Sequence, residues 1–257
     1  MSAHGRMVAL IPARGGSKRV PGKNTALLAG HPLLAYSVRA ALDSGVFAAV
    51  VASTESPEIA AVAARHGAAV PFLRPAEYAG DLSPDLDWVV HALTALAAGG
   101  DTFDSFAILR PTSPFRLPET IRRAKALFDA DPAADSLRAV QPCREHPGKM
   151  WVERGGRLLP LMPFATERQP WHSSPYQALP RVYVQNASLE MAHVRVPLTR
   201  GTIAGEVVLP FVTQGHEGFD INSPEDLETA RALAASGRAR LPHVPQPPDV
   251  SDTEVRP

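Results

Sequence analysis

The sequence predicts an α/β fold built on a doubly wound, mostly parallel sheet. Short apolar segments that suit buried strands alternate with longer segments whose apolar residues recur at helical spacing. Loops containing glycine or basic residues follow several of the predicted strands. This alternation favours parallel strands joined by right-handed crossover helices, and such sheets bind ligands outside the carboxyl ends of their strands.

Local composition predicts the individual elements. Met7 to Pro12 (MVALIP) is a short apolar run that ends in proline, which is typical of a buried parallel strand. Ser56 and Ser223 each precede a proline, as an N-cap residue precedes proline at the first helical position. The expected strands are 7–12, 47–52, 69–73, 105–109, 136–141, 181–191 and 207–212, and the expected helices are 31–41, 57–67, 86–98, 118–129 and 224–235.

The composition excludes several classes of protein. Basic and acidic residues number 26 each, and we expect no nucleic-acid partner because phosphate backbones select basic surfaces. Cys143 is the single cysteine, which excludes an internal disulfide and a cysteine-rich zinc site. No apolar stretch approaches the roughly 20 residues that span a bilayer, and the first residues lack the apolar region of a signal peptide. We therefore expect a cytoplasmic protein without a membrane partner.

The length of 257 residues suits one large α/β domain, which we expect at residues 1–240. The periodic pattern is lost between about 146 and 180, where six prolines occur together with Trp151, Trp171 and Tyr176. This segment is expected to be an inserted lobe, either a flap over an acceptor or a contact between subunits. The proline-rich end, 241–257, is expected to be disordered.

A loop rich in glycine and basic residues follows the first strand. It reads IPARGGSKRVPGKN from Ile11 to Asn24. Its glycines let backbone amides approach an anion closely, and its four basic residues can balance the charge of a triphosphate. The loop matches neither the P-loop pattern nor the dinucleotide-binding pattern. Composition alone also leaves open a solvated basic loop.

This segment resembles the signature of the acylneuraminate cytidylyltransferase family, which makes CMP-sialic acid and related CMP-activated acids. The similarity continues in the family's order through STESPEIAAVAARHGAAVPFLRPAEYAGD, LRPTSPFR, HPGKMW and GFDINSPEDL, over roughly residues 7 to 235. The resemblance implies the Rossmann-like fold of nucleotide-diphospho-sugar transferases. It also implies transfer of CMP from CTP to a small acidic, sialic or nonulosonic acid-like acceptor, with release of pyrophosphate.

The resemblance further implies which residues bind the nucleotide. Positions around the CTP triphosphate are matched by Arg14, Gly15, Gly16, Ser17, Lys23 and Asn24. Arg74 matches a nucleotide-contacting arginine, and Asp81 and Ser83 match the segment that closes on the cytidine. Without the resemblance, Arg74 could be a surface arginine and Ser83 an ordinary N-cap. Positioning and electrostatic stabilisation supply most of the rate of such a transfer, and the expected catalytic residues are Arg14, Lys23 and Asp220.

The family's metal site is an Asp-x-Asp pair that implies Mg²⁺ as cofactor. In this chain the pair reads Asp220-Ile221-Asn222. Side chains at i and i+2 of an extended segment share a face, so both can reach one ion. Asn222 brings no negative charge, and hard cations favour carboxylates, which puts the second ligand in doubt. The alternative for Asn222 is a turn or capping role before Ser223.

The acceptor side departs further from the family. Arg110 stands in LRPTSP where relatives have glutamine, and Tyr176 stands in PYQALP where relatives use an arginine for the sialic acid carboxylate. We expect an anionic acceptor with Arg110 taking over part of the charge recognition; alternatively, Arg110 pairs with a nearby acidic residue. The expected acceptor-binding residues are Arg110, Thr112, Ser113, Lys149, Tyr176, Gln177 and Asn186.

Alternative functions remain open at this level. The chain could be a sister nucleotidyltransferase that uses another nucleotide, a transferase to a non-sugar acid such as a phosphonate, or a catalytically weak nucleotide-binding protein. The resemblance also suggests a homodimer formed through residues 146–180, whose aromatic residues and prolines fit an interface and a lid equally well.

Overall fold

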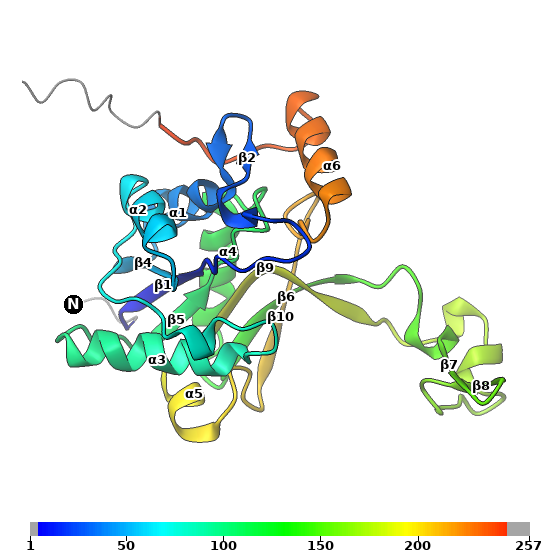
Figure 1. Cartoon of the computed structure of the whole chain (residues 1–257). Coiled ribbons are helices and arrows are strands. Elements are labelled where there is room, and N and C mark those ends of the chain that lie inside the picture. Colours follow the sequence, from blue (N-terminus) through cyan, green and yellow to red (C-terminus); the bar gives the residue numbers. More distant parts are fainter. Residues whose placement is uncertain (1–4, 246–257) are drawn as a thin grey trace, which may run out of the picture. The chain divides into compact units, whose positions relative to one another are not determined.

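Residues 5–245 are described in the computed structural model, and they include a six-stranded sheet (Figure 1). The strand order is β10-β6-β9-β5-β1-β4. β1 pairs in parallel with β4 and β5, whereas β9 runs antiparallel to β5. The predicted α/β class is confirmed. The strands are β1 (Met7–Pro12), β4 (Ala49–Ser53), β5 (Ser105–Ile108), β6 (Ser136–Pro142), β9 (Tyr183–His193) and β10 (Val208–Val212).

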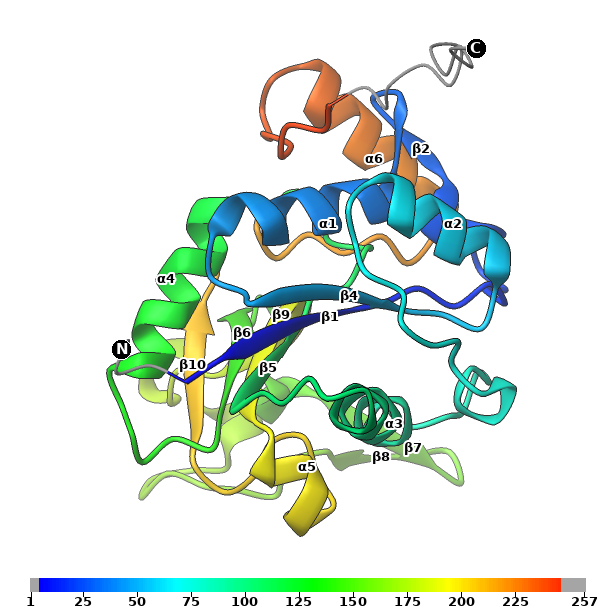
Figure 2. The ribbon, with the colours of Figure 1, turned by 90° about the vertical axis from the view of Figure 1, so that its left-hand side faces the viewer.

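Helices cover both faces of this sheet. Figure 2 shows α1 and α2 on one side and α3 and α5 on the other. A short antiparallel hairpin of β2 (Leu27–Leu28) and β3 (His31–Pro32) precedes α1. The helices are α1 (Leu33–Ser44), α2 (Pro57–Arg65), α3 (Asp85–Ala98), α4 (Pro118–Asp129), α5 (Arg195–Arg200) and α6 (Pro224–Ala235).

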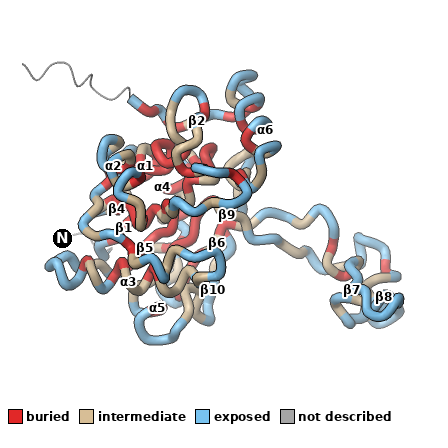
Figure 3. The backbone as a smooth tube through the Cα atoms, viewed as in Figure 1, coloured by how far each residue is buried: buried red, intermediate tan, exposed pale blue. Residues whose placement is uncertain are grey.

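The alternation of side chains in β1 explains how one strand serves two cores. Ala9 and Ile11 pack in a cluster with residues of α1, α2 and α4, while Val8 and Leu10 pack in a cluster with residues of α3. Successive side chains of a strand point to opposite faces, so an unbroken apolar run is required where both faces are covered. Figure 3 shows the resulting buried backbone through the central strands.

The parallel strands end at one edge of the sheet. The phosphate loop follows β1, Glu55 lies two residues after β4, and Arg110 lies two residues after β5. Because β9 runs antiparallel to β5, the residues early in β9 come to the same edge. This edge gathers the polar residues of the site.

The two predicted serine caps are formed. The Ser56 hydroxyl accepts a hydrogen bond from the backbone N–H of Ile59 at the start of α2. At α6, Ser223 accepts from the Asp226 N–H, and the Asp226 carboxylate accepts from the Ser223 N–H, which forms a capping box. Each cap satisfies backbone donors that the first helical turn leaves unpaired.

The predicted strand at 69–73 is wrong. The structure forms there a single parallel bridge between Val51 and Ala69. Pro71 has no N–H to donate to a sheet ladder, so pairing stops after Ala69. The segment nevertheless reaches the edge of the sheet, because the Arg74 N–H donates to the Thr54 carbonyl at 2.8 Å.

Val140–Gln185 form a second compact unit. It contains an antiparallel hairpin of β7 (Trp151–Arg154) and β8 (Arg157–Pro160), which the sequence analysis does not anticipate. Gly155 and Gly156 turn the chain between these strands with positive φ values of 57° and 75°, as a two-residue hairpin turn requires. The expected single domain with an inserted lobe at 146–180 remains a prediction.

The predicted disordered end, 241–257, lies mostly outside the described residues. Within the described part, Val244 is buried and belongs to a cluster with residues of α6. No helix in residues 5–245 is long and apolar enough to span a membrane.

Candidate active site

A cavity of about 400 Å³ opens at the carboxyl edge of the sheet and collects most of the predicted nucleotide-binding residues. It lies entirely within the larger of the two compact units. Tyr78, Gly80, Asp85, Trp88 and Ala187 also line it, although the sequence did not single them out. The predicted residues that line it are Arg14, Ser17, Lys23, Asn24, Arg74, Asp81, Ser83, Arg110, Thr112, Asp220 and Asn222.

The phosphate loop is held by its own side chains and by one acidic residue. The buried Asn24 amide donates to the Arg14 carbonyl at 2.8 Å, which fixes the curvature of the loop. The Gly15 N–H donates to a Glu55 carboxylate oxygen at 2.7 Å. At Gly16, a Cβ would have open space, so this glycine leaves its backbone uncovered. The loop thus presents backbone atoms as well as cationic side chains.

Lys23 connects the phosphate loop to the segment around Asp220. Its Nζ donates to the Ile221 carbonyl at 2.9 Å. Burial lowers the pKa of Lys23, and the nearby Asp220 carboxylate partly opposes this effect. A half-buried ammonium beside a carboxylate is suited to meet phosphate charge in a site with limited water.

Asp81 pairs with two cations of the phosphate loop. Its carboxylate lies 2.8 Å from the Arg14 guanidinium and 2.6 Å from the Lys18 ammonium. Hydrogen bonds from Lys18 and Arg14 hold the pKa of Asp81 below its usual value. The neighbouring Ser83 hydroxyl donates to the Glu77 carbonyl and accepts from the Gly80 N–H, which stabilises the turn that carries Asp81.

Arg74 is 5% exposed and is held on the cavity wall by three contacts. Its guanidinium donates to the hydroxyl and the carbonyl of Ser53 at 3.0 and 2.8 Å. It also lies over the Trp88 ring, 4.8 Å from the centroid. Burial lowers its pKa to about 10, so the side chain stays charged at neutral pH.

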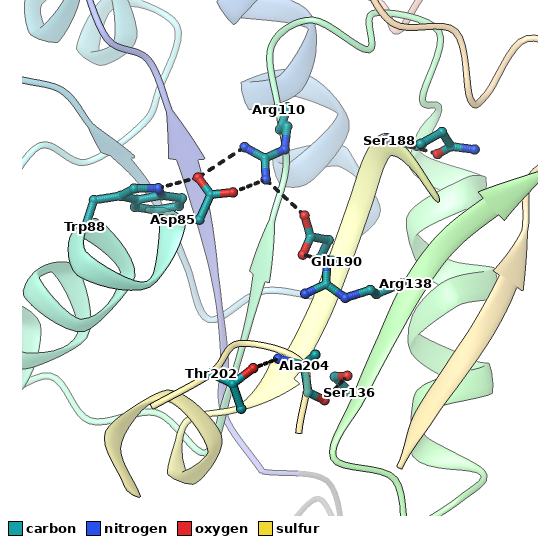
Figure 4. Close-up of polar contacts among 10 residues, drawn as sticks. Asp85, Trp88, Arg110, Ser136, Arg138, Ser188, Glu190, Thr202 and Ala204 are labelled. Atoms are coloured by element: carbon teal, nitrogen blue, oxygen red, sulfur yellow. Dashed lines mark hydrogen bonds and ion pairs between the residues drawn. The ribbon is translucent and has the colours of Figure 1, made fainter. Parts of the chain in front are cut away.

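Arg110 lies between two carboxylates. Its guanidinium contacts Asp85 at 2.5 Å and Glu190 at 3.0 Å (Figure 4). Burial opposes its charge, but Asp85 and Glu190 outweigh burial and raise the pKa of Arg110. The alternative named from the sequence, a pair with an acidic residue, is therefore the geometry present, and the predicted acceptor contact of Arg110 remains a prediction.

Asp220 has an oxygen available for a cation. Its Oδ2 accepts from the Asn222 amide at 2.6 Å, while its Oδ1 is buried and makes no hydrogen bond within residues 5–245. Within the same residues, no group of three or more His, Cys, Asp or Glu side chains could hold a metal. One free carboxylate oxygen fits Mg²⁺, which binds through one or two carboxylates and completes its coordination with substrate phosphates and water.

The remaining predicted acceptor residues are divided between the two units. In the larger unit Thr112 lines the cavity, Ser113 is buried, and the Asn186 amide donates to the Thr213 hydroxyl at 3.0 Å. The fully buried Arg116, which the sequence analysis overlooks, supports this region through the carbonyls of Arg110 and Ser188.

Lys149, Tyr176 and Gln177 belong to the smaller unit. The Lys149 ammonium donates to the carbonyls of His172 and Ser174, at 3.0 and 2.5 Å, and lies 5.6 Å from the centre of the Tyr176 ring. Tyr176 and Gln177 are exposed. These contacts organise the smaller unit, and their predicted contact with an acceptor remains a prediction.

Comparisons with known proteins agree with this architecture. A family model described as cytidylyltransferase matches residues 8–126. The chain is 36% identical over 225 residues to the CMP-N,N'-diacetyllegionaminic acid synthase of Legionella pneumophila, covering 86% of this chain and 93% of the relative. It is 37% identical over 119 residues to a pseudaminic acid cytidylyltransferase of Campylobacter jejuni, covering 46% of this chain and 51% of the relative.

A solved structure shares the fold. The CMP:2-keto-3-deoxy-manno-octonic acid synthetase complexed with CTP superposes with a TM-score of 0.66 at 18% sequence identity, covering 90% of this chain and 99% of that chain. The fold, the family model and the relative from Legionella pneumophila together show that the chain is an α/β nucleotidyltransferase. The chain belongs to the cytidylyltransferase family, in which the predicted resemblance to acylneuraminate cytidylyltransferases is confirmed. It is a CTP-dependent nucleotidyltransferase.

Proposed function

We propose that this cytidylyltransferase transfers CMP from CTP to a hydroxyl group of a nonulosonic acid, an acidic sugar of the legionaminic, sialic or pseudaminic type. The observation that carries the proposal is the single cavity lined by three segments distant in sequence: the phosphate loop, Arg74, and Asp220 with Asn222. The names of the relatives from Legionella pneumophila and Campylobacter jejuni support this class of acceptor.

In this proposal the chain supplies charge and position. Arg14 and Lys23 contact the phosphates, with the backbone donor of Gly16 and side-chain donors of Ser17 and Asn24 nearby, while the Gly15 N–H holds the loop to Glu55. The oxygen of the acceptor hydroxyl attacks the α-phosphorus, the bond from this phosphorus to the bridging oxygen of the β-phosphate breaks, pyrophosphate leaves, and the hydroxyl proton passes to water. Cationic groups stabilise the charge that develops on the transferred phosphoryl group and on the leaving pyrophosphate.

Contact of the triphosphate with Arg14 has a consequence for Asp81, because that carboxylate already pairs with Arg14 and Lys18. The triphosphate and Asp81 compete for the same cations. We propose that Asp81 and Ser83, whose turn borders the cavity, rearrange toward the nucleoside when the phosphates bind. Arg74, held by Trp88 and Ser53, supplies a fixed part of the cavity wall.

Mg²⁺ is the proposed cofactor, and when bound it would neutralise phosphate charge. Asp220 would hold it through the buried Oδ1, with the Asn222 amide oxygen as a neutral second ligand. Thr112, Ser113 and Asn186 of the larger unit are proposed to contact the acceptor. Lys149, Tyr176 and Gln177 of the smaller unit remain predicted acceptor residues. A cytoplasmic location is part of the same proposal.

A homodimer formed through the smaller unit is also proposed. The hairpin and the loop that follows it expose large apolar side chains, with exposed fractions of 63% at Leu158, 50% at Phe164 and 43% at Trp151. An isolated two-stranded hairpin is marginally stable in water, so a partner surface would stabilise it. Light scattering on the full chain tests this: a dimer that Leu158→Ser dissociates supports it, and a wild-type monomer at micromolar concentration contradicts it.

The acceptor class is tested by pyrophosphate release from CTP with a panel of legionaminic, sialic and pseudaminic acids, keto-deoxyoctulosonate and a small phosphonate. Release with one nonulosonic acid supports the proposal. Release with keto-deoxyoctulosonate or the phosphonate, and none with the nonulosonic acids, contradicts it. Ser17→Ala serves as a phosphate-loop variant, and Lys125→Ala, whose residue pairs with Asp129 within α4 and does not line the cavity, is the control.

A further inference from the structure

Arg110 belongs to a line of ion pairs in which negative and positive side chains alternate, in the order Asp85, Arg110, Glu190 and Arg138. These four residues come from α3, the segment after β5, β9 and β6. Asp85, in the first turn of α3, contacts the Arg110 guanidinium, which also contacts Glu190 on β9 (Figure 4). The second oxygen of Glu190 accepts from Arg138 on β6 at 2.5 Å. Two arginines and two carboxylates thus balance to zero net charge. Arg110 brings no surplus positive charge to the cavity.

The burial of these groups makes the pairing costly to disturb. The side chains of Arg110 and Glu190 are 25% and 8% exposed. An acceptor carboxylate at Arg110 would add a third negative charge to a guanidinium that Asp85 and Glu190 already neutralise, and displacing Glu190 would leave a buried carboxylate without this partner. Removing one partner of a buried ion pair carries a large penalty because the remaining charge is left uncompensated.

Asp85 extends the line toward the nucleotide side of the cavity. Its Oδ1, which lies 3.4 Å from the Arg110 guanidinium, accepts a hydrogen bond of 2.8 Å from the Trp88 indole N–H. The Trp88 ring is the surface on which Arg74 lies. Arg110 therefore fixes Asp85, Asp85 fixes the orientation of the indole, and the indole fixes Arg74.

We propose that Arg110 is a positioning residue for nucleotide binding, acting on Arg74 through Asp85 and Trp88, and is not a ligand of the acceptor. The inference rests on the proposed contact of Arg74 with the nucleotide. From the sequence alone, the arginine at position 110, where relatives have glutamine, is expected to recognise the charge of the acceptor. The inference assigns it to the nucleotide side instead. The acidic acceptor is then recognised by groups other than Arg110.

The test compares Arg110→Gln, Arg110→Lys and Asp85→Asn with the wild type by calorimetric titration with CTP in the absence of acceptor. We expect Arg110→Gln and Asp85→Asn to weaken CTP binding by about tenfold, because each removes a charge-assisted hydrogen bond from the line. Arg110→Lys keeps the charge but not the two-pronged geometry, and we expect it to restore part of the affinity. The double variant Arg110→Gln/Asp85→Asn should be no weaker than the worse single variant, since both changes act through one line.

Glu190→Gln is the matched control. It disrupts an ion pair of the same arginine but leaves the Asp85–Trp88–Arg74 contacts in place, so CTP affinity should stay within about twofold of the wild type while thermal stability falls. A merely structural role of Arg110 would make all these variants lose CTP affinity in proportion to stability.

Steady-state kinetics separates the two roles of Arg110. The inference expects Arg110→Gln to raise the KM for CTP and to leave the KM for the acceptor nearly unchanged. An acceptor KM that rises at least tenfold while CTP affinity stays at the wild-type level would overturn it. If the wild type itself does not bind CTP, the proposed function fails. Should Arg110→Gln not fold, Asp85→Asn and Arg110→Lys carry the same comparison.

Discussion

The Nζ of Lys23 donates a hydrogen bond of 2.9 Å to the carbonyl oxygen of Ile221, 198 residues further along the chain. This contact joins the phosphate loop to the segment that carries Asp220 and Asn222. The contact therefore holds the Lys23 ammonium, which is proposed to bind phosphate, close to Asp220, the proposed metal ligand. Burial lowers the pKa of Lys23, and the nearby Asp220 carboxylate partly opposes this effect, so placing an ammonium here costs the fold free energy.

Lys23→Met is expected to abolish most of the activity with little change in thermal stability. The substitution removes a phosphate-facing charge, for which a loss of about 100-fold in kcat is reasonable. It also removes the hydrogen bond to Ile221 together with a half-buried ammonium whose pKa burial lowers, and because these two effects oppose each other the melting temperature should change little. Lys18→Met is the comparison within the same loop, because the Lys18 side chain is 83% exposed and does not line the cavity, and it should lose far less activity than Lys23→Met. Equal losses in both variants would contradict a special role for Lys23.

Asp81→Asn is expected to strengthen binding of free pyrophosphate. The Asp81 carboxylate competes with phosphate oxygens for Arg14 and Lys18, and ion pairs near the surface are weak enough for a phosphate to replace them. Removing this competitor should tighten pyrophosphate binding by about threefold to tenfold in a calorimetric titration. The same variant should not tighten cytidine binding. Weaker pyrophosphate binding would show that Asp81 supports the phosphate site.

Asn222→Asp is expected to reduce the Mg²⁺ concentration needed for half-maximal activity. A second carboxylate beside Asp220 increases the negative charge offered to a hard cation, and we expect a decrease of about three- to tenfold. Asn222→Ala, which removes the amide oxygen, is the control and should require more metal or show no change. A metal requirement that is the same in Asn222→Asp and the wild type would mean that position 222 does not face the ion.

Asp135, which does not line the cavity, is expected to make the free energy of unfolding depend on pH. The backbone N–H groups of Glu206 and Val207, followed by Arg200 and Arg195, lower its pKa to about 2 from an ordinary value of 3.8. A carboxyl group with a lowered folded-state pKa stabilises the fold above its unfolded-state pKa, and this contribution is lost as pH falls from about 4 to about 2.

Chemical denaturation of Asp135→Asn against the wild type tests this. The difference in unfolding free energy should be large at pH 7 and shrink as the pH is lowered below 4. Asp101→Asn is the control, since Asp101 pairs with Arg6 at 3.6 Å through an exposed side chain, and it should differ little from the wild type at any pH. A pH-independent difference for Asp135→Asn would exclude the ionic contribution.

The sequence predicts the elements that have strong local signals. The apolar run of β1 and the proline starts of α4 and α6 have the predicted bounds. The predicted strand at 69–73 is wrong because of Pro71. The apolar residues of this segment favour a strand, but Pro71 has no N–H to donate to a neighbouring strand. The Gly155-Gly156 pair between β7 and β8 was an available hairpin signal in a segment treated as irregular.

The sequence predicts the parts of the site whose residues are close together in the chain. It does not predict contacts between residues that are distant in sequence and come together only on folding. The basic loop after β1 and the Asp220-Asn222 pair are local patterns, and they line one cavity. The partners of Arg110 are 25 and 80 residues away, and no local pattern connects them to it. Glu55 likewise meets Gly15 across 40 residues, through the register of β1 and β4.

The most direct test of the central claim is pyrophosphate release by the full chain with CTP, a nonulosonic acid and Mg²⁺, with UTP, ATP and GTP as parallel substrates. The account predicts release with CTP at least about 100-fold faster than with the other nucleotides, dependent on the metal and on the acid, and lost in Asp220→Asn. Release that is faster with another nucleotide, or that persists unchanged in Asp220→Asn, would contradict it.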